Sequence, residues 1–388
     1  MKDEVKQRMR AVERFLSGEA PEAICASMGR SRAWLYRWAK RYSVNDDAWC
    51  HSQSTKPNNV TNRTPFEIEE IVKMVRLNLY NQDLFCGAQA ILWELEDLGV
   101  KPLPSVRTIN RILSRNGLTH RRTGKYEPKG TPYPKLPALL PNQTHQMDLV
   151  GPCYLTGPLR FYGINVIDIA TVRCGLHSSR SKTGQDVLDG VWSIWSRLGI
   201  PDNLQVDNAM SFFGSPKYPR ATSQFIRLCL HTGVEPWFIP MSEPWRNGMI
   251  EQFNDHYQQK FLGKVFMSTT DELRSGTLAF EQRHNSRYRY SKLGGKTPLK
   301  ALTATQAKLR FPNQEEQPRQ RLQKPEIGRY HLVRLIRSDL KLNIFGELFS
   351  VPTELKLEYV VATIDVKEQK LKLFLDKTQV DELDYKMR

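Results

Sequence analysis

Three apolar stretches near the middle of the chain decide the fold: THQMDLV (144–150), FYGINVIDIA (161–170) and TVRCGLH (171–177). Their short runs of β-branched and aromatic residues predict three strands, of which the last two form a hairpin. A helix-spaced apolar pattern follows at 183–198, and then a short buried strand at 204–206. Three strands followed by alternating helices and strands predict a mixed α/β layer fold.

Three acidic residues occupy notable places in these elements. Asp148 lies inside the first strand, and Asp207 ends the buried strand LQV. Glu251 is one turn into a helix that starts at Asn247. A carboxylate in an apolar strand is costly unless it is paired or bound to a metal. Strand ends and a helix start at one sheet edge can bring three acids together, and a divalent cation would relieve their repulsion.

Carboxylate oxygens favour Mg²⁺ or Mn²⁺ as ligands. Two such ions can clamp the attacking and leaving oxygens of an in-line phosphoryl displacement. Asp255 follows Glu251 by one helical turn and is the reserve candidate. Asp168, in VIDIA, is interpreted as structural, and His145 as structural or DNA-facing.

Upstream of the acids, the chain predicts two helical DNA-binding units. Residues 1–45 combine short helices, a Gly29 turn and a basic third helix, which is the helix-turn-helix pattern; an ordinary three-helix bundle is the alternative. Residues 64–118 repeat the arrangement as a second helix-turn-helix domain. The expected DNA-binding side chains on the two basic helices are Arg32, Arg37, Lys40, Arg41, Arg107, Arg111 and Arg115.

Two linkers and a terminal domain complete the expected organisation. Residues 119–141 form a basic, Pro-rich linker, a strap along the phosphate backbone that includes Arg121 and Arg122. The α/β core is assigned to 142–302, and a second basic linker to 303–326. Residues 327–388 contain five short alternating strands, which predict a small β-barrel.

The charge distribution supports binding to a polyanion. The 388 residues carry a net charge of +16, with +8 in residues 1–141, −1 in 142–282, +11 in 283–337 and −2 in 338–388. A near-neutral middle with basic flanks suits a protein held on nucleic acid on both sides of its chemistry, whereas the alternative is a solvated basic surface.

The absence of certain sequence features indicates the cellular compartment of the protein. There is no long uncharged apolar run and no secretory signal, so no membrane partner is expected. The six cysteines are scattered, which indicates a reducing compartment. Cys25, Cys50, His51 and Cys86 lack the spacing of zinc ligands, so no structural zinc is expected.

A family resemblance adds to this interpretation. QMDLVGP, LGIPDNLQVDNAMSFFG and PWRNGMIEQFN resemble, in order and context, the three catalytic blocks of DDE transposases in the retroviral-integrase superfamily. The domain order is similar to that of bacterial insertion-sequence transposases. The spacing between Asp207 and Glu251 is longer than usual in the family, and the extra length is assigned to the loop FFGSPKYPRATS.

The resemblance implies an RNase H-like core that binds two Mg²⁺ or Mn²⁺ ions through Asp148, Asp207 and Glu251. It implies that the chain binds the terminal repeats of an element, cleaves their 3′ ends and joins them to target DNA. The partners would be double-stranded DNA and further copies of the chain, at least a dimer on DNA, in the bacterial cytoplasm at the nucleoid.

Further DNA-binding residues are expected near the core. Asn208 would bind DNA or orient Asp207, whereas Arg246 and Asn247 would contact phosphate or sugar, or act as a simple turn or cap. Arg287 and Arg289 belong to an interleaved run of charged and aromatic residues that suits a DNA-facing helix. Two alternatives to the transposase are an RNase H-like nuclease or resolvase, and a domesticated DNA-binding regulator with an idle core.

Overall fold

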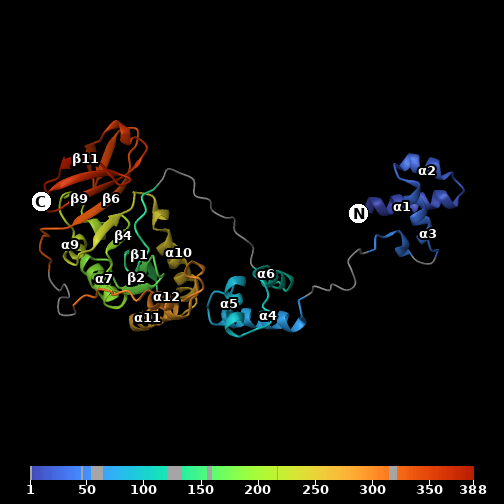
Figure 1. Ribbon diagram of the computed structural model, residues 1–388, viewed down its shortest axis with the longest axis horizontal. Helices are drawn as coiled ribbons and strands as arrows, with labels where there is room; N and C mark the ends of the chain where they lie inside the picture. Colours follow the sequence, from blue (N-terminus) through green and yellow to red (C-terminus); the bar gives the residue numbers. More distant parts are fainter. Residues whose placement is uncertain are drawn as a thin grey trace. The chain divides into compact units, whose positions relative to one another are not determined.

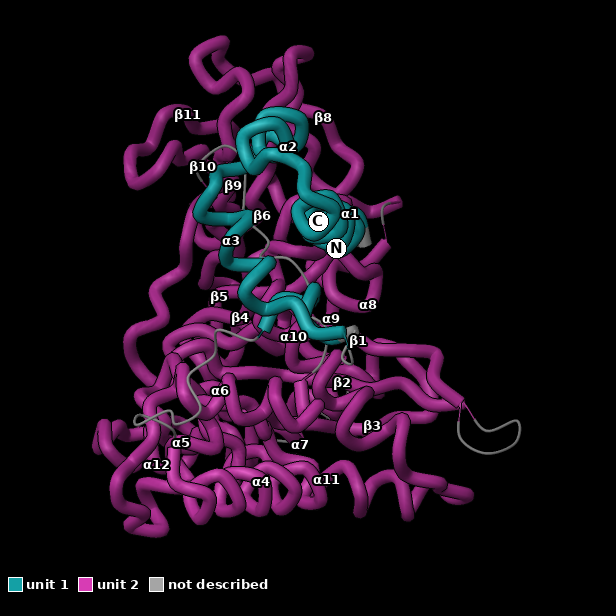
Figure 2. The backbone as a smooth tube through the Cα atoms, turned by 90° about the vertical axis from the view of Figure 1, so that its right-hand side faces the viewer, with its two compact units in different colours: residues 1–63 teal, residues 64–388 magenta. Residues whose placement is uncertain are grey.

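The computed structural model describes most of the chain and divides it into two compact units. The units are residues 1–63 and 64–388 (Figure 2). Arg121 and Arg122, and much of the two predicted basic linkers, lie outside the described residues. In the described ranges, no helix combines the length and apolar character needed to cross a membrane. The described residues are 2–44, 47–53, 64–119, 133–154, 160–215, 217–313 and 321–388.

The first unit is a group of short helices around a small core. The core contains Ala11, Ile24 and Leu35. Ser31 caps the third helix by accepting a hydrogen bond from the Trp34 N–H, as its position before the basic helix predicts. The elements are α1 (Lys2–Leu16), α2 (Pro21–Met28), α3 (Arg32–Arg41) and η1 (Asp47–Cys50).

The second unit begins with three more helices (Figure 1). Their apolar faces meet in a core that includes Val72, Ile91 and Ile109. Ser105 caps the last of them by accepting from the Thr108 N–H at 3.2 Å. The helices are α4 (Phe66–Asn81), α5 (Ala88–Asp97) and α6 (Val106–Arg115).

A mixed sheet follows, with helices on both faces. Strand β1 pairs antiparallel with β2, which pairs antiparallel with β3. On its other side β1 pairs parallel with β4, and β4 pairs parallel with β5. The mixed α/β layer fold predicted from the sequence is therefore confirmed. The strands are β1 (Thr144–Tyr154), β2 (Arg160–Asp168), β3 (Cys174–Ser179), β4 (Asn203–Val206) and β5 (Glu235–Phe238).

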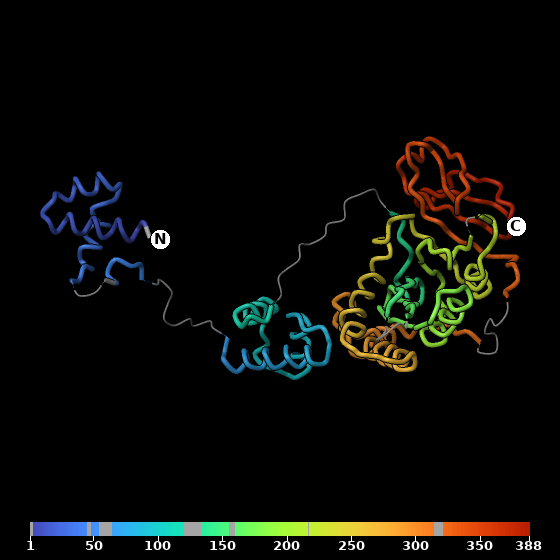
Figure 3. The backbone as a smooth tube through the Cα atoms, turned by 180° about the vertical axis from the view of Figure 1, so that it is seen from behind, coloured from blue at the N-terminus to red at the C-terminus, as the bar shows by residue number. Residues whose placement is uncertain are grey.

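Alternation along the strands separates two hydrophobic cores. Ile164 and Val166 of β2 pack with α7 and α9, whereas Phe161 and Ile167 of the same strand pack with α10 and α11. Helices accordingly cover both faces of the sheet. Figure 3 shows the course of the same backbone from behind. Trp195 is fully buried in the first of these cores.

The remaining elements of this region connect the sheet and its covering helices. They are α7 (Gly184–Leu198), α8 (Met210–Phe213), α9 (Gln224–His231), η2 (Pro244–Asn247), α10 (Gly248–Tyr257), η3 (Gln258–Leu262, a π-helical turn), α11 (Thr270–Arg287), η4 (Ser291–Leu293) and α12 (Pro298–Thr305).

The C-terminal strands extend the core sheet and do not form the separate barrel that the sequence predicts. Strand β6 lies parallel to β5, with Trp237 opposite His331 and Phe238 opposite Leu332. The sheet continues through β9, β10 and β11, and no closed barrel is formed by the described strands. Alternation predicts strands correctly here, but it does not specify the partner of the first one, and β6 pairs with the open edge of β5.

Only β7 and β8 stand outside this nine-stranded sheet, among the strands that the structure describes, and they pair with each other. The sixth strand of the region, β11, was not predicted. The C-terminal elements are β6 (Arg329–Leu335), β7 (Lys341–Ile344), β8 (Glu347–Ser350), η6 (Thr353–Leu355), β9 (Tyr359–Asp365), β10 (Lys370–Leu375) and β11 (Thr378–Asp384).

Candidate functional site

Two of the predicted acids lie near each other along adjacent parallel strands: Asp148 is on β1, and Asp207 directly follows the end of β4. The register pairs Gln146 of β1 with Gln205 of β4. Asp148 and Asp207 each come two residues after one of these glutamines. Because side chains alternate along a strand, Asp148 points to the same side of the sheet as Gln146, and the charge of Asp207 is close enough to raise the pKa of Asp148, after burial of that carboxyl. The register therefore places both carboxylates at one edge of the core.

The two glutamines anchor the helix that carries the third acid. The Gln146 Oε1 accepts hydrogen bonds from the backbone N–H groups of Met249 and Ile250, both at 3.1 Å. The Gln205 Nε2 donates to the carbonyl of Arg246 at 2.8 Å. These bonds hold the start of α10, and with it Glu251 in the first turn, against β1 and β4.

Neither glutamine was identified from the sequence. The signal that could have found them is the repeated spacing of Gln-Met-Asp at 146–148 and Gln-Val-Asp at 205–207. In each case a polar residue precedes the Asp on the same strand face, where an apolar residue would be expected in a buried strand. Both glutamines are buried.

Asp148 is fixed by two hydrogen bonds. Its Oδ1 accepts from the Leu149 N–H at 2.8 Å, and its Oδ2 accepts from the Asn254 Nδ2 at 2.7 Å. The Asn254 Oδ1 in turn accepts from Asn165 of β2 at 2.8 Å. Asn254, one turn after Glu251, therefore joins α10 to β1 and β2, a role that sequence reasoning missed.

The pKa of Asp148 is raised, first by burial and then by the negative charges of Asp207 and Glu251. Burial also raises the pKa of Asp207, against the opposing effects of the Ala209 N–H and of the Lys182 charge. Both effects disfavour the ionised carboxylates in the protein alone. A bound cation would reverse them, because it favours the charged form of each ligand.

The donor set suits a hard cation, but the three acids are not preassembled as ligands. In the described part of the chain, no three His, Cys, Asp or Glu side chains converge as they would around a metal ion. Glu251 is half-buried, and neither a hydrogen bond nor an ion pair engages its carboxylate within the described residues. The Glu251 charge is one of the causes that raise the pKa of Asp148, after burial and the charge of Asp207, which places its carboxylate near that site.

Asn208, next to Asp207, is held by a buried arginine of β6. The Asn208 Nδ2 donates to the Ile239 carbonyl at 2.6 Å, and its Oδ1 accepts from Arg334 at 2.8 Å. Arg334 is 6% exposed and also donates to the carbonyls of Ile239 and Asn343. Burial lowers the pKa of Arg334 to about 10. Of the two roles predicted for Asn208, these bonds favour orienting the turn at Asp207.

Arg246 and Asn247 have protein partners as well. Arg246 donates to Glu243 at 2.9 Å and to the Tyr359 hydroxyl at 3.0 Å, and its guanidinium lies 4.1 Å from the ring centroid of Tyr133. Asn247 is buried and donates to the Met147 carbonyl at 3.0 Å. Both side chains therefore have partners within the protein, and the Asn247 side chain does not cap α10.

The run from Arg287 to Tyr290 packs on the helices α4 and α5. Arg287 donates to Gln82 at 2.9 Å, and Arg289 donates to Asp97 at 2.6 Å. Tyr288 is 1% exposed, belongs to the core of these helices and donates to the Asp83 carbonyl. Interleaved arginines and tyrosines therefore contact protein here, although their pattern predicts a DNA-facing helix.

The predicted side chains of the first basic helix are exposed. Arg37, Lys40 and Arg41 lie on the outer face of α3, with Arg41 stacked on Trp38 at 5.0 Å. Arg32 is also exposed and forms an ion pair with Glu22.

The second basic helix is divided. Arg107 and Arg111 of α6 are exposed, and no ion pair engages them in the described ranges. Arg115 instead donates to Glu69 of α4, at 3.1 Å from its Nε. Two of the three arginines are thus available for a ligand.

Asp168 and His145 are built into the protein interior. Asp168 is fully buried and accepts from the backbone N–H groups of Asn142, Ala170 and Thr171. His145 is fully buried, and burial lowers its pKa to about 3. These environments support the structural interpretation and leave His145 no access to DNA.

Two segments match known domain families. Residues 2–46 match the homeodomain-like domain, and residues 232–298 match the integrase core domain. The chain carries an integrase core domain. This match agrees with the resemblance to the retroviral-integrase superfamily seen in the sequence. The N-terminal segment of the chain is of the homeodomain-like kind, a DNA-binding fold class.

The matched part of the integrase core domain includes α10 with Glu251, whereas Asp148 and Asp207 precede it. No match is found among curated proteins.

Solved structures similar to the chain include two viral integrases. The HTLV-2 integrase catalytic core domain in complex with magnesium (trimeric form) is 16% identical; the match covers 42% of this chain and 99% of that chain, with a TM-score of 0.34. A simian T-cell lymphotropic virus intasome, in complex with the PP2A regulatory subunit B56 gamma, is 12% identical over 81% of this chain and 96% of that chain, with a TM-score of 0.36.

Proposed function

We propose that the chain is a DDE transposase that binds the terminal repeats of its element, cleaves their 3′ ends and joins them to target DNA. The observation that carries this proposal is the placement of Asp148 on β1 and of Asp207 directly after the adjacent parallel strand β4, beside the helix that bears Glu251. The homeodomain-like match at residues 2–46 supplies the DNA-binding part of the proposal.

The three acids would hold two Mg²⁺ or Mn²⁺ ions. Their oxygens are the ligands these ions prefer, and the mutual repulsion that raises the pKa of Asp148 is what a divalent cation relieves. Bound ions would supply Lewis-acid stabilisation of the attacking and leaving oxygens. The protein's own contribution is positioning: Gln146 and Gln205 fix the start of α10, and Asn254 orients Asp148.

Recognition is assigned to the exposed cations of the two helical units. We propose that DNA is contacted by Arg32, Arg37, Lys40 and Arg41 of α3, and by Arg107 and Arg111 of α6. Each unit would occupy its own stretch of major groove.

The proposed oligomeric state follows from the number of DNA ends in an element. One active site processes one strand end at a time, yet an element has two ends to be joined together. The active species would therefore be at least a dimer on DNA, and we place it at the bacterial nucleoid. Sedimentation of the end-bound complex tests this, because an active complex with one protomer would contradict it.

The decisive experiment is a strand-transfer assay with Mg²⁺ and DNA that carries the inverted repeats flanking the gene. A transposase joins these ends to target DNA. A nuclease or resolvase of the same fold would cut without such joining, and a DNA-binding regulator would do neither. Failure to join ends under conditions in which the chain binds them would contradict the proposal.

A further inference from the structure

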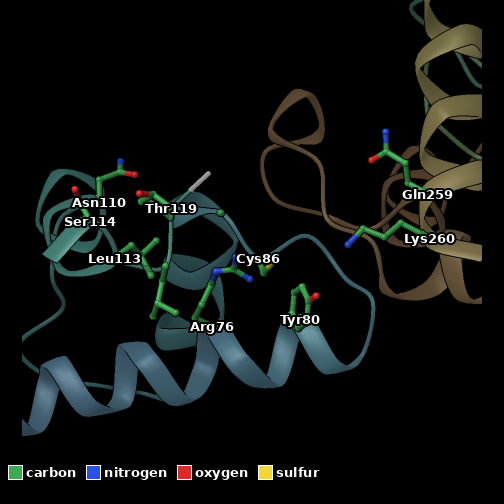
Figure 4. Close-up of a pocket in the computed structure, with 12 residues that line it drawn as sticks. Arg76, Tyr80, Cys86, Asn110, Leu113, Ser114, Thr119, Gln259 and Lys260 are labelled. Carbon is green, nitrogen blue, oxygen red and sulfur yellow. The ribbon is translucent and has the colours of Figure 1, made fainter. Parts of the chain in front are cut away.

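A pocket of about 660 Å³ lies between the helices α4–α6 and the turn that follows α10 (Figure 4). Its wall combines basic, polar and small apolar side chains, and none of its lining residues is acidic. We infer that this pocket binds a backbone phosphate of duplex DNA, an inference that rests on the proposed function. The residues that line it are Arg76, Tyr80, Cys86, Gly87, Ala88, Asn110, Leu113, Ser114, Leu118, Thr119, Gln259 and Lys260.

Arg76 is the principal reason for assigning an anion to the pocket. It is only 8% exposed, and it lines the pocket from the middle of α4. Within the described part of the chain it forms no hydrogen bond or ion pair. Its guanidinium carbon lies 5.6 Å from the centroid of the Tyr80 ring, in a cation–π contact. A buried guanidinium without a counter-charge is costly, and an anion in the pocket would remove that cost.

The start of α5 supplies further donors on the same wall. Gly87 and Ala88, the N-cap and first residue of this ten-residue helix, both line the pocket. No side chain caps the helix, so its first backbone N–H groups are available to a ligand. A helix N-terminus favours phosphate both through these N–H groups and through its dipole.

Lys260 brings a second positive charge from the opposite side. It belongs to the π-helical turn η3, and its Nζ lies 3.4 Å from the Leu84 carbonyl. Hydroxyl and amide groups of Asn110, Ser114 and Thr119 complete the polar lining. The pocket therefore offers donors for a phosphate from both sides, from the helices α4–α6 and from the turn η3.

The surroundings favour a DNA phosphate over a small free anion. The pocket is much larger than one phosphate group, and Leu113 and Leu118 provide apolar wall for the flanking sugars. Arg107 and Arg111 are exposed on α6, the helix that also contributes Asn110 and Ser114. They extend the positive surface beyond the pocket, as binding along a duplex backbone requires.

The test measures duplex binding by the full chain across a salt series, in EDTA so that no chemistry occurs. Arg76→Met removes the charge, and Arg76→Lys retains it. We expect Arg76→Met to weaken binding about tenfold at low salt and to reduce the slope of log K against log[salt] by about 1. We expect Arg76→Lys to restore most of the slope.

Lys73→Met is the matched control, because Lys73 is on the same helix, pairs with Glu70 and does not line the pocket. Its slope should equal that of the wild type. An Arg76→Met slope equal to the Lys73→Met slope would overturn the inference. If Arg76→Met fails to fold by circular dichroism, Lys260→Met replaces it, with the same two outcomes.

Single methylphosphonate substitutions along the duplex then locate the phosphate. One substitution should weaken binding by the wild type but not by Arg76→Met. Inorganic phosphate is the competing ligand. If millimolar phosphate raises the unfolding temperature of the wild type but not of the Arg76 variants, and the salt slopes of DNA binding agree for all proteins, the pocket binds free phosphate. The DNA assignment would then be wrong. Because none of these measurements requires catalysis, the pocket can stand even if strand transfer is absent.

Discussion

The acidic edge of the core (Asp148, Asp207 and Glu251) and the docking segment (Arg287–Tyr290) both have charged residues in suggestive patterns, but the structure treats them differently. At the acidic edge the carboxylates repel one another and no cationic side chain is bonded to them within the described residues. In the docking segment each arginine is bonded to protein. A charge that lacks its counter-charge is the better indication of where a ligand binds, whereas a pattern of charge alone is not.

The largest effect is expected from a substitution of Asp207 at the acidic edge. Asp207→Asn keeps the shape of the side chain but removes an anionic ligand, so strand transfer should fall by about 10³-fold or more. The measurement is joining of labelled ends with Mg²⁺. DNA affinity should stay at the wild-type value and the unfolding temperature should not fall, because the variant removes a repelling buried charge. A variant that joins ends at near the wild-type rate would show that the acid was wrongly assigned.

The docking segment should respond in the opposite way. Tyr288→Ala removes a side chain that is 1% exposed, and we expect it to lower the free energy of unfolding by about 3 kcal/mol. Urea denaturation measures this change, with Tyr218→Ala, at a side chain 60% exposed, as the control. The Mg²⁺ dependence of any remaining activity should not change. A loss of activity without a loss of stability would place this segment on DNA after all.

A smaller effect is expected from the glutamines that support the acidic edge. Gln146→Ala leaves all three acids in place but releases the backbone N–H groups of Met249 and Ile250 at the start of α10. We expect a rise of about 10- to 100-fold in the Mg²⁺ concentration needed for half-maximal strand transfer. Gln185→Ala, on an exposed turn of α7, serves as the control. If excess Mg²⁺ fails to recover activity in folded Gln146→Ala, positioning of the metal ligands is not its role.

The exposed arginines of α3 test the contrast between unpaired and paired charges on the surface proposed to bind DNA. Arg37 is exposed, and no ion pair engages it in the described part, whereas Arg32 is paired with Glu22. Arg37→Ala should weaken specific binding by about 1–3 kcal/mol if it reads a base, or reduce the salt slope by about 1 if it contacts phosphate. Arg32→Ala should have the smaller effect. Anisotropy titrations over a salt series distinguish these outcomes.

The last prediction is a pH dependence of stability from His145. Burial lowers its pKa to about 3, below the usual value of about 6.5, so the unfolded chain binds more protons between these two pH values. Stability contributed by neutral His145 is therefore present above about pH 6.5 and is lost as the pH falls, by at most about 1.4 kcal/mol per pH unit. His145→Gln should flatten this part of the curve of unfolding free energy against pH, and an unchanged curve would contradict the assignment.

Local patterns in the sequence predicted most elements because their causes are local. Apolar spacing locates the helices, which in the structure begin at the caps Ser31 and Ser105, and alternation locates the strands of the core. The strand positions of Asp148 and Asp207 also follow from the sequence, since each acid interrupts or ends an apolar run.

Partners distant along the chain could not be predicted in the same way. Nothing near Arg289 indicates that Asp97 lies beside it, and nothing near Arg334 indicates a bond to Asn208. The same is true of β6, whose alternation is equally compatible with a barrel and with pairing to β5. These contacts depend on which surfaces meet after the local elements have formed.

The pairing of β6 with β5 has a practical consequence for dissecting the protein. A fragment that stops near residue 302, where a catalytic domain would ordinarily be cut, would leave β5 as an open parallel edge with unpaired N–H and C=O groups. It would also remove Arg334 from the turn beside Asp207. Such a fragment should self-associate through the uncovered strand, and the smallest well-behaved catalytic fragment should extend through the terminal strands.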